Sequence, residues 1–224
     1  MNDGAASPSL DGGCRAVRMS GDFPLVTARL RLDPVGWDDL AELLALHRDP
    51  RVFTADSTAP VETAAQMRWV LGQWITCWER HGTGYLTVRS RGGGERGPDG
   101  PLGHLPEGLL GVVGISLLRT DAGEQRSAYW RLAPTAQGRG VAAEAMRAVL
   151  AHPALGGSRR VIAVTATGNA PSRALAERLG FRLAQPEELA SGEVGTGRAE
   201  PGSAEPRDAV PGGRAGDVLL IRDP

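Results

Sequence analysis

The sequence predicts a mixed α/β domain, with an α+β mixed sheet that holds parallel and antiparallel strands together. Segments with strand-like alternation and segments with helical spacing follow one another in the order β-α-α-β-β-β-α-β-α-β-β. Two predicted helices come in succession near the N-terminus, and a single strand-helix-strand crossover follows between residues 127 and 167. A doubly wound nucleotide-binding fold needs repeated crossovers. The order therefore favours one mixed sheet over a Rossmann-type domain.

Length and charge narrow the possible classes of protein. The chain has 224 residues, with 25 basic and 26 acidic side chains, so we expect one domain and no field that attracts nucleic acid. We expect no membrane span and no signal peptide, because no apolar run approaches about 18 residues and the N-terminus is polar. Cys14 and Cys77 form no disulfide framework or metal cluster, and the four histidines lack ligand spacing. These features predict a cytoplasmic protein without a metal.

Three segments are rich in Gly, Pro, Ser and charged residues: 1–21, about 90–107 and about 190–215. Such compositions bury too little apolar surface to offset the entropy of ordering the chain. We therefore expect a disordered N-terminal tail over 1–21, followed by a single domain over 22–224 that carries two mobile loops.

The elements of the N-terminal half follow from their patterns. Residues 28–35 alternate apolar and charged side chains, which predicts a half-buried strand. Residues 36–49 have helical spacing, and residues 61–82 predict a longer helix that ends at Gly82. The segments 84–90 and 108–119 then predict a pair of strands separated by the first loop.

In the C-terminal half, Pro134 closes a strand over 127–134, and an Ala-rich helix follows over 140–155. The β-branched run 159–167 predicts a buried strand. Residues 169–180 predict a helix with Asn169 as its N-cap, Pro171 in its first turn and Gly180 beyond its end. The remaining predicted strands are 181–184 and 217–222.

A glycine-containing turn links the strand at 127–134 to its helix. The turn lacks the Lys-Ser/Thr pair of a P-loop, and Ala143 stands where a Rossmann fingerprint needs its third glycine. It does match [QR]-x-x-G-x-[GA] over residues 137–142, "QGRGVA". Small residues there would let backbone N–H groups converge on a pyrophosphate, helped by the helix dipole.

With this turn, the chain resembles the GNAT superfamily of N-acetyltransferases, and more narrowly its RimJ/RimL-type branch. The stretches that carry the resemblance stand in the family's order: "LVTARLRL", "QMRWVLGQW", "LLGVVGISLL", "YWRLAPTAQGRGVAAEAM" and "RVIAVTATGNAPSRALAERLGFR". Together they span about residues 25–185. The glycine turn followed by N-x-x-S and L-G-F makes the resemblance specific.

The resemblance implies a GNAT acyl-CoA N-acyltransferase fold and acetyl transfer from acetyl-CoA to a primary amine, by direct attack of the amine. It implies that the strand ending near Leu132 splays from the next strand, and that the N–H of Leu132 faces the thioester oxygen. Ser172 is the second expected catalytic residue. The residues expected to bind acetyl-CoA are Trp130, Leu132, Gln137, Gly138, Arg139, Gly140, Val141, Ala142, Asn169 and Ser172.

One position departs from the family pattern. Many members have a tyrosine that protonates the CoA thiolate, and Ala176 stands at the matching position here. Ser172 is then the nearest hydroxyl group. The general base stays open, with four candidates or a relay through bulk water; the candidates are Glu79, His81, Glu124 and Glu144.

Several alternatives remain at the level of sequence. Ala176 and the two insertions also fit a catalytically silent acyl-CoA-binding module. A generic nucleotide-binding domain is disfavoured, because the turn matches neither the P-loop nor the Rossmann fingerprint. The acceptor is either a protein or peptide N-terminus or a small amine. Asp49, Asp56 and Glu62 would attract a cationic acceptor or would be solvated turn charges. We expect a monomer or a homodimer.

Overall fold

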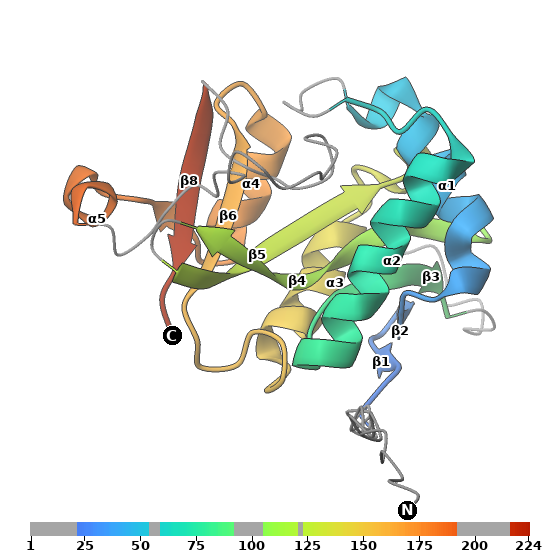
Figure 1. The fold of residues 1–224 in the computed structure, drawn as a ribbon, viewed down its shortest axis with the longest axis horizontal. Coiled ribbons are helices and arrows are strands. Elements are labelled where there is room, and N and C mark those ends of the chain that lie inside the picture. Colours follow the sequence, from blue (N-terminus) through green and yellow to red (C-terminus); the bar gives the residue numbers. More distant parts are fainter. Residues whose placement is uncertain (1–21, 54–58, 92–104, 121–122, 192–215) are drawn as a thin grey trace, which may run out of the picture.

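The computed structural model describes residues 22–53, 59–91, 105–120, 123–191 and 216–224 (Figure 1). The described strands are β1 (Leu25–Val26), β2 (Leu30–Pro34), β3 (Tyr85–Ser90), β4 (Leu109–Thr120), β5 (Gly123–Leu132), β6 (Val161–Ala166), β7 (Arg182–Leu183) and β8 (Asp217–Arg222). The α-helices are α1 (Leu40–Arg48), α2 (Ala64–His81), α3 (Val141–Ala151), α4 (Ala170–Arg178) and α5 (Pro186–Ala190). Three short 3-10 helices are η1 (Trp37–Asp39), η2 (Pro50–Val52) and η3 (Pro134–Ala136).

The strands form one sheet in the order β1-β2-β3-β4-β5-β6-β8-β7. Neighbouring strands are antiparallel except β5 and β6, which are parallel and joined through α3. This is the predicted mixed sheet with its single crossover, so the predicted fold class is confirmed.

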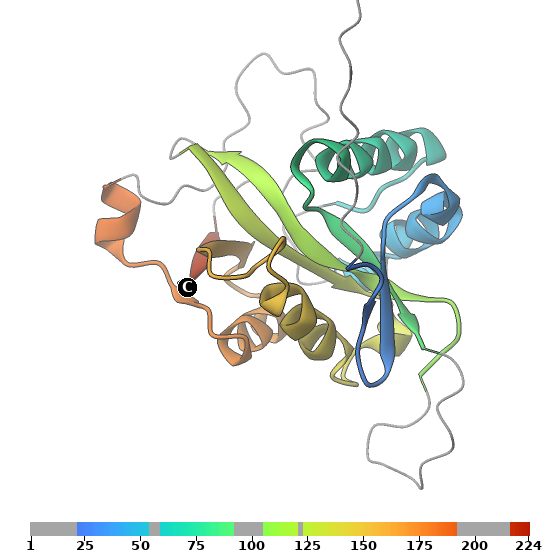
Figure 2. The same ribbon diagram turned by 90° about the horizontal axis from the view of Figure 1, so that it is seen from below.

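Helices cover both faces of the sheet. Figure 2 shows α1 and α2 on one side and α3 and α4 on the other. The fully buried residues Leu43 of α1 and Leu71 of α2 belong to the same core cluster as Met146 of α3 and Leu86 of β3. The central strand β4 is buried along most of its length because helices cover it on both faces.

Local signals fix the ends of α2, which begins three residues later than predicted, and the start of α4. Thr63 accepts a hydrogen bond from the N–H of Gln66, and Gln66 accepts one from the N–H of Thr63, so a capping box starts α2. Gly82, with φ of 62°, ends that helix. Asn169 caps α4 through the N–H of Ser172.

Helix α3 is shorter than its pattern predicts. It ends at Ala151 instead of continuing to residue 155, and His152 is extended with ψ of 127°. Pro153 explains the difference, because a proline disfavours the helical conformation of the residue before it.

One further predicted boundary was wrong, and one helix was not predicted. Strand β5 begins at Gly123, not at residue 127, because its polar start pairs with the long β4, from Thr120↔Gly123 onward. The helix that was not predicted is α5, which follows the predicted strand 181–184 and begins where the N–H of Gln185 donates to the carboxylate of Glu188.

The predicted tail and most of both predicted loops lie outside the described residues. At the edges of the first loop, Ser90 still belongs to β3 and Leu105 is buried. Within the described part of the chain, no helix is both long and apolar enough to cross a membrane.

Candidate functional site

Strands β5 and β6 separate shortly after they begin to pair. Their ladder holds only Arg126↔Val161 and Ser127↔Ile162. Beyond these pairs β6 continues beside β8 while β5 runs away from it, as Figure 1 shows. The backbone groups of residues 128, 130 and 132, which lie on this edge of β5, therefore have no partner in β6.

A cleft of about 620 Å³ occupies this gap and reaches both faces of the sheet. On one side its lining includes the turn before α3 and the first turn of α4; on the other it includes residues of α1 and η2. All the predicted acetyl-CoA residues except Arg139 line it. The structure thus brings together residues that lie on β5, the turn, α3 and α4.

The N–H group of Leu132 faces the cleft. The N–H of Ala133 donates to the carbonyl of Leu110 on β4 at 2.9 Å. Because successive backbone groups of a strand point to opposite edges, the N–H and carbonyl of Leu132 point away from β4. The side chain of Gln137 donates to that carbonyl at 3.1 Å, which holds the turn against the end of β5.

The turn before α3 requires its glycines. Gly138 and Gly140 have φ of 72° and 74°, in the left-handed region that other residues rarely adopt. The first hydrogen bond within the helix runs from the N–H of Glu144 to the carbonyl of Gly140. The N–H groups of residues 141–143 therefore precede the helical ladder and can bind an anion.

Ser172 and Trp130 meet across the gap. The indole N–H of Trp130, on β5, donates to the hydroxyl oxygen of Ser172, on α4, at 3.0 Å. Asn169 accepts from the N–H of Ser172 at 3.1 Å, which fixes the start of the helix. Ala176, one turn further along α4, is fully buried and offers no hydroxyl group.

The other side of the cleft contains a hydrogen-bonded group that the sequence did not indicate. The ring of His47, on α1, donates from Nδ1 to the carbonyl of Leu43 at 2.8 Å, because a carbonyl only accepts. Its Nε2 then accepts from the hydroxyl of Tyr129 at 3.2 Å. That hydroxyl in turn accepts from Nε of Arg131 at 2.6 Å.

This group joins β5 to the wall of the cleft. The guanidinium of Arg131 lies 3.9 Å from the centroid of the Phe53 ring and donates to the carbonyl of Val52 at 3.3 Å. Burial, followed by the charge of Arg131, lowers the pKa of His47 to about 4. His47 is therefore neutral at neutral pH. One signal in the sequence does indicate part of this group. Side chains alternate along a strand, so "YWRL" places Tyr129 and Arg131 on the face of the sheet opposite Trp130.

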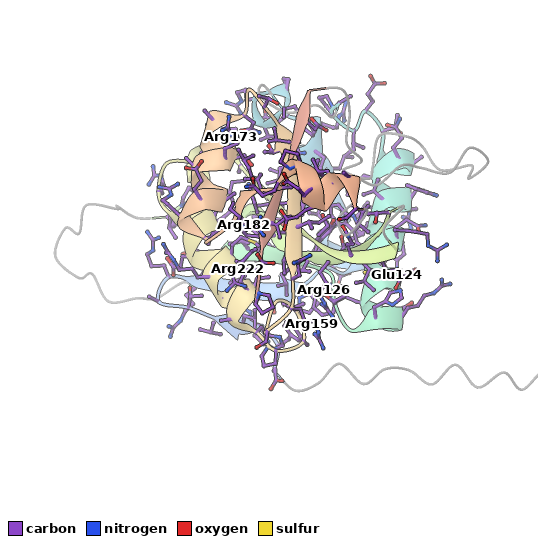
Figure 3. All side chains as sticks on the ribbon, turned by 90° about the vertical axis from the view of Figure 1, so that its left-hand side faces the viewer. Glu124, Arg126, Arg159, Arg173, Arg182 and Arg222 are labelled. Carbon is purple, nitrogen blue, oxygen red and sulfur yellow. The ribbon has the colours of Figure 1, made fainter. Side chains whose placement is uncertain are left out.

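None of the four predicted base candidates lines the cleft. Glu79 and His81 are exposed near the end of α2. Glu124 is exposed at the start of β5, and Figure 3 shows it far from Arg173, which follows Ser172 in α4. The structure therefore does not support any of these three residues as the base.

Glu144 instead binds Arg29 and Thr27, near β2. Burial acts to raise the pKa of Glu144, but hydrogen bonds from Thr27 and Arg29 and the charge of Arg29 outweigh it and lower the pKa. A carboxylate held in this way is a poor acceptor of a proton from a substrate.

The charged side chains among the described lining residues are all arginines: Arg51, Arg131 and Arg178. Asp49 lies outside the lining and binds Arg51 at 2.6 Å, and Glu62 also lies outside it. Asp56 is outside the described residues. Over the part of the chain that the structure describes, no group of three or more His, Cys, Asp or Glu residues could hold a metal ion.

Comparison with known proteins identifies the family of the chain. The sequence model described as the acetyltransferase (GNAT) domain matches residues 29–182. The chain therefore belongs to the GNAT acetyltransferase family, and the family resemblance of the sequence is confirmed. No curated protein sequence matches the chain significantly.

Solved structures share the fold. A protein from Bordetella pertussis assigned to the GnaT-family acetyltransferases is 28% identical, with a TM-score of 0.60, and the match covers 88% of this chain and 98% of that chain. RimL, a ribosomal L7/L12 α-N-protein acetyltransferase, is 15% identical with a TM-score of 0.60, covering 90% and 93%. Spermidine N-acetyltransferase from Vibrio cholerae, in complex with CoA and spermine, is 15% identical with a TM-score of 0.55, covering 87% and 95%.

Proposed function

We propose that this protein transfers an acetyl group from acetyl-CoA to a primary amine, by direct attack of the amine on the thioester. The observation that carries the proposal is the cleft between β5 and β6, which runs from the N-terminus of α3 to the group around His47. An acyl donor could enter from one face of the sheet and an amine from the other. Membership of the GNAT family supports the same reaction.

The residues on the α3 side fit acetyl-CoA. The N–H groups of residues 141–143 and the helix dipole favour a pyrophosphate, and Gly138 and Gly140 add no side chains at two positions of the turn. The edge of β5 that faces away from β4 offers the backbone groups of Trp130 and the N–H of Leu132 to the amides of the pantetheine arm. Acetyl-CoA supplies the acetyl group and a thiolate leaving group.

Two groups of the chain stabilise the charge that develops during transfer. The N–H of Leu132 donates to the thioester oxygen as negative charge builds on it, as in an oxyanion hole. The hydroxyl of Ser172 donates a hydrogen bond to the sulfur as the carbon–sulfur bond breaks. Since no carboxylate of the described residues lines the cleft, we propose that the amine binds in its neutral form and that its proton leaves through water.

The amine enters on the side of His47, Tyr129 and Phe53. RimL acts on a protein N-terminus and the Vibrio cholerae enzyme on spermidine, as their names state. We propose a protein or peptide N-terminus, as in the RimJ/RimL-type branch, or a small amine as the acceptor. Peptides with free N-termini and small amines are therefore the two classes to test.

The test is release of CoA from acetyl-CoA in the presence of these two classes of amine. Gly140→Trp should abolish turnover, because the indole would fill the turn before α3. Gly123→Trp is the matched control: Gly123 also has positive φ, at 90°, and lies outside the cleft lining. Equal loss of activity in both variants would contradict the assignment of the turn.

A second function rests on Ala176, which leaves the buried face of α4 without the family's tyrosine. In that case the protein binds acyl-CoA without transferring the acyl group. Saturable binding of acetyl-CoA, with no turnover for any amine of either class, would favour this binding module over the enzyme.

A further inference from the structure

The hydrogen bond between Trp130 and Ser172 restricts the direction of the serine proton. An indole N–H can only donate, so the Ser172 oxygen must accept in this 3.0 Å contact. The proton of the serine hydroxyl therefore points away from Trp130. Both residues line the cleft, so the free volume beside this hydroxyl is the proposed site of the thioester.

Each partner of this hydrogen bond is held by other contacts. The Trp130 ring packs edge to face against Phe181, with ring centroids 6.3 Å apart. Ser172 lies in the first turn of α4, where its N–H donates to the side chain of Asn169. The bond thus joins β5 to α4 at the place where β5 and β6 are no longer paired.

We propose that Trp130 is a positioning residue that orients the Ser172 hydroxyl toward the sulfur of the acyl donor. The inference rests on the proposed acetyl transfer. As the nitrogen–carbon bond forms and the carbon–sulfur bond breaks, the electron pair of the broken bond moves to sulfur. Ser172 donates a hydrogen bond to this sulfur, which finally takes the proton that the amine has lost through water.

The position of Trp130 explains how α4 can act without a tyrosine. Ala176 is fully buried and has no hydroxyl group, so Ser172 is the hydroxyl that α4 contributes to the cleft lining. A serine side chain rotates freely about its carbon–oxygen bond. The indole N–H removes part of that freedom before the donor binds. The hydroxyl therefore loses less rotational freedom on reaching the transition state.

A double-mutant cycle tests the proposal. Trp130→Phe keeps an aromatic ring against Phe181 but removes the N–H donor, and should lower kcat about fivefold, the effect of one neutral hydrogen bond. Ser172→Ala should lower kcat by at least as much, and Ser172→Thr should restore most of it. In the Ser172→Ala background, Trp130→Phe should have no further effect on kcat. The Kd for acetyl-CoA should change less than kcat, within about twofold, because the hydrogen bond from Ser172 strengthens only as negative charge builds on the sulfur in the transition state.

A purely structural role for Trp130 gives a different pattern. Losses in kcat that multiply in the double variant, or a matching rise in the Kd for acetyl-CoA, would overturn the proposal. If Trp130→Phe folds poorly, benzothienylalanine at position 130 replaces the N–H by sulfur in a ring of similar shape, and the same cycle applies. Absence of wild-type turnover would refute the proposed function and this inference together, whereas turnover with multiplying losses would refute this inference alone.

Discussion

The guanidinium of Arg29 binds the carboxylate of Glu144 through two nitrogens, each 2.7 Å from the same oxygen. The other oxygen accepts from the N–H of Arg29 and the hydroxyl of Thr27. Because Arg29 precedes β2 and Glu144 lies in the first turn of α3, the contact ties the edge of the sheet to the glycine turn. A Cβ on Gly140 would lie 3.5 Å from the same guanidinium.

Glu144→Gln should destabilise the folded protein by about 1 to 2 kcal/mol, since the ion pair is partly exposed but carries several charge-assisted hydrogen bonds. The pKa of Glu144 is lowered in the folded state, so its contribution is complete above the ordinary value of 4.5 and is lost as the pH falls through the folded value. Urea unfolding of both proteins at several pH values measures this. Glu177→Gln, an exposed position on α4, is the control.

His47 should make the protein less stable in acid. Its pKa falls from 6.5 to about 4 on folding, first through burial and then through the charge of Arg131. The unfolded chain therefore takes up the proton before the folded one, and stability decreases as the pH falls through this window, by about 3 kcal/mol in all. His47→Gln should remove this dependence in thermal or urea unfolding. An unchanged slope would show that His47 ionises in the folded protein as it does in the unfolded chain.

Tyr129→Phe should weaken binding of the amine more than binding of acetyl-CoA. The hydroxyl of Tyr129 joins His47 to Arg131, and Arg131 packs against Phe53 on the proposed amine side. We expect the KM of the amine to rise roughly fivefold, the effect of about one hydrogen bond, with the KM of acetyl-CoA unchanged. Steady-state kinetics with each substrate varied separately measures both.

The matched control for this prediction is Tyr85→Phe. The two tyrosine rings lie 4.9 Å apart, but the Tyr85 hydroxyl bonds to Ser116 and Tyr85 does not line the cleft. A similar rise in the amine KM for both variants would contradict a specific role of Tyr129 on the amine side.

Asn169→Ala should destabilise the protein by about 1 kcal/mol, because the first turn of α4 loses its cap. Asn169→Ser should retain most of the stability, since serine caps helices about as well. Thermal unfolding compares them. If alanine and serine have the same effect, the hydrogen bond from the N–H of Ser172 does not stabilise α4.

The features that the sequence predicts best are those that depend on residues close together in the chain, such as caps and turns. The cap of α4 at Asn169 and the turn at Gly138 and Gly140 are local, and each lies where its pattern indicates. The early end of α3 also has a local cause, because Pro153 disfavours the helical conformation of His152. Strand β5, by contrast, begins at Gly123 through pairing with β4, and polar residues carry no alternation that would show this.

The side of the cleft around His47 could not be predicted in this way. His47, Phe53 and Tyr129 come from α1, the end of η2 and β5, and only the folded sheet brings them together. Glu144, one of the four expected base candidates, could not be excluded from the sequence for the same reason. Its carboxylate turns toward Arg29, a partner more than a hundred residues away in the sequence.

The most direct test of the central claim is amide hydrogen exchange with and without acetyl-CoA. The N–H groups of Leu132 and residues 141–143 have no partner in the sheet or helix ladders, so exchange there should slow when the donor binds. Exchange in β3, on the far side of β4, should not change. Binding of acetyl-CoA without protection at residues 132 and 141–143 would contradict the claim that the gap between β5 and β6 holds the acyl donor.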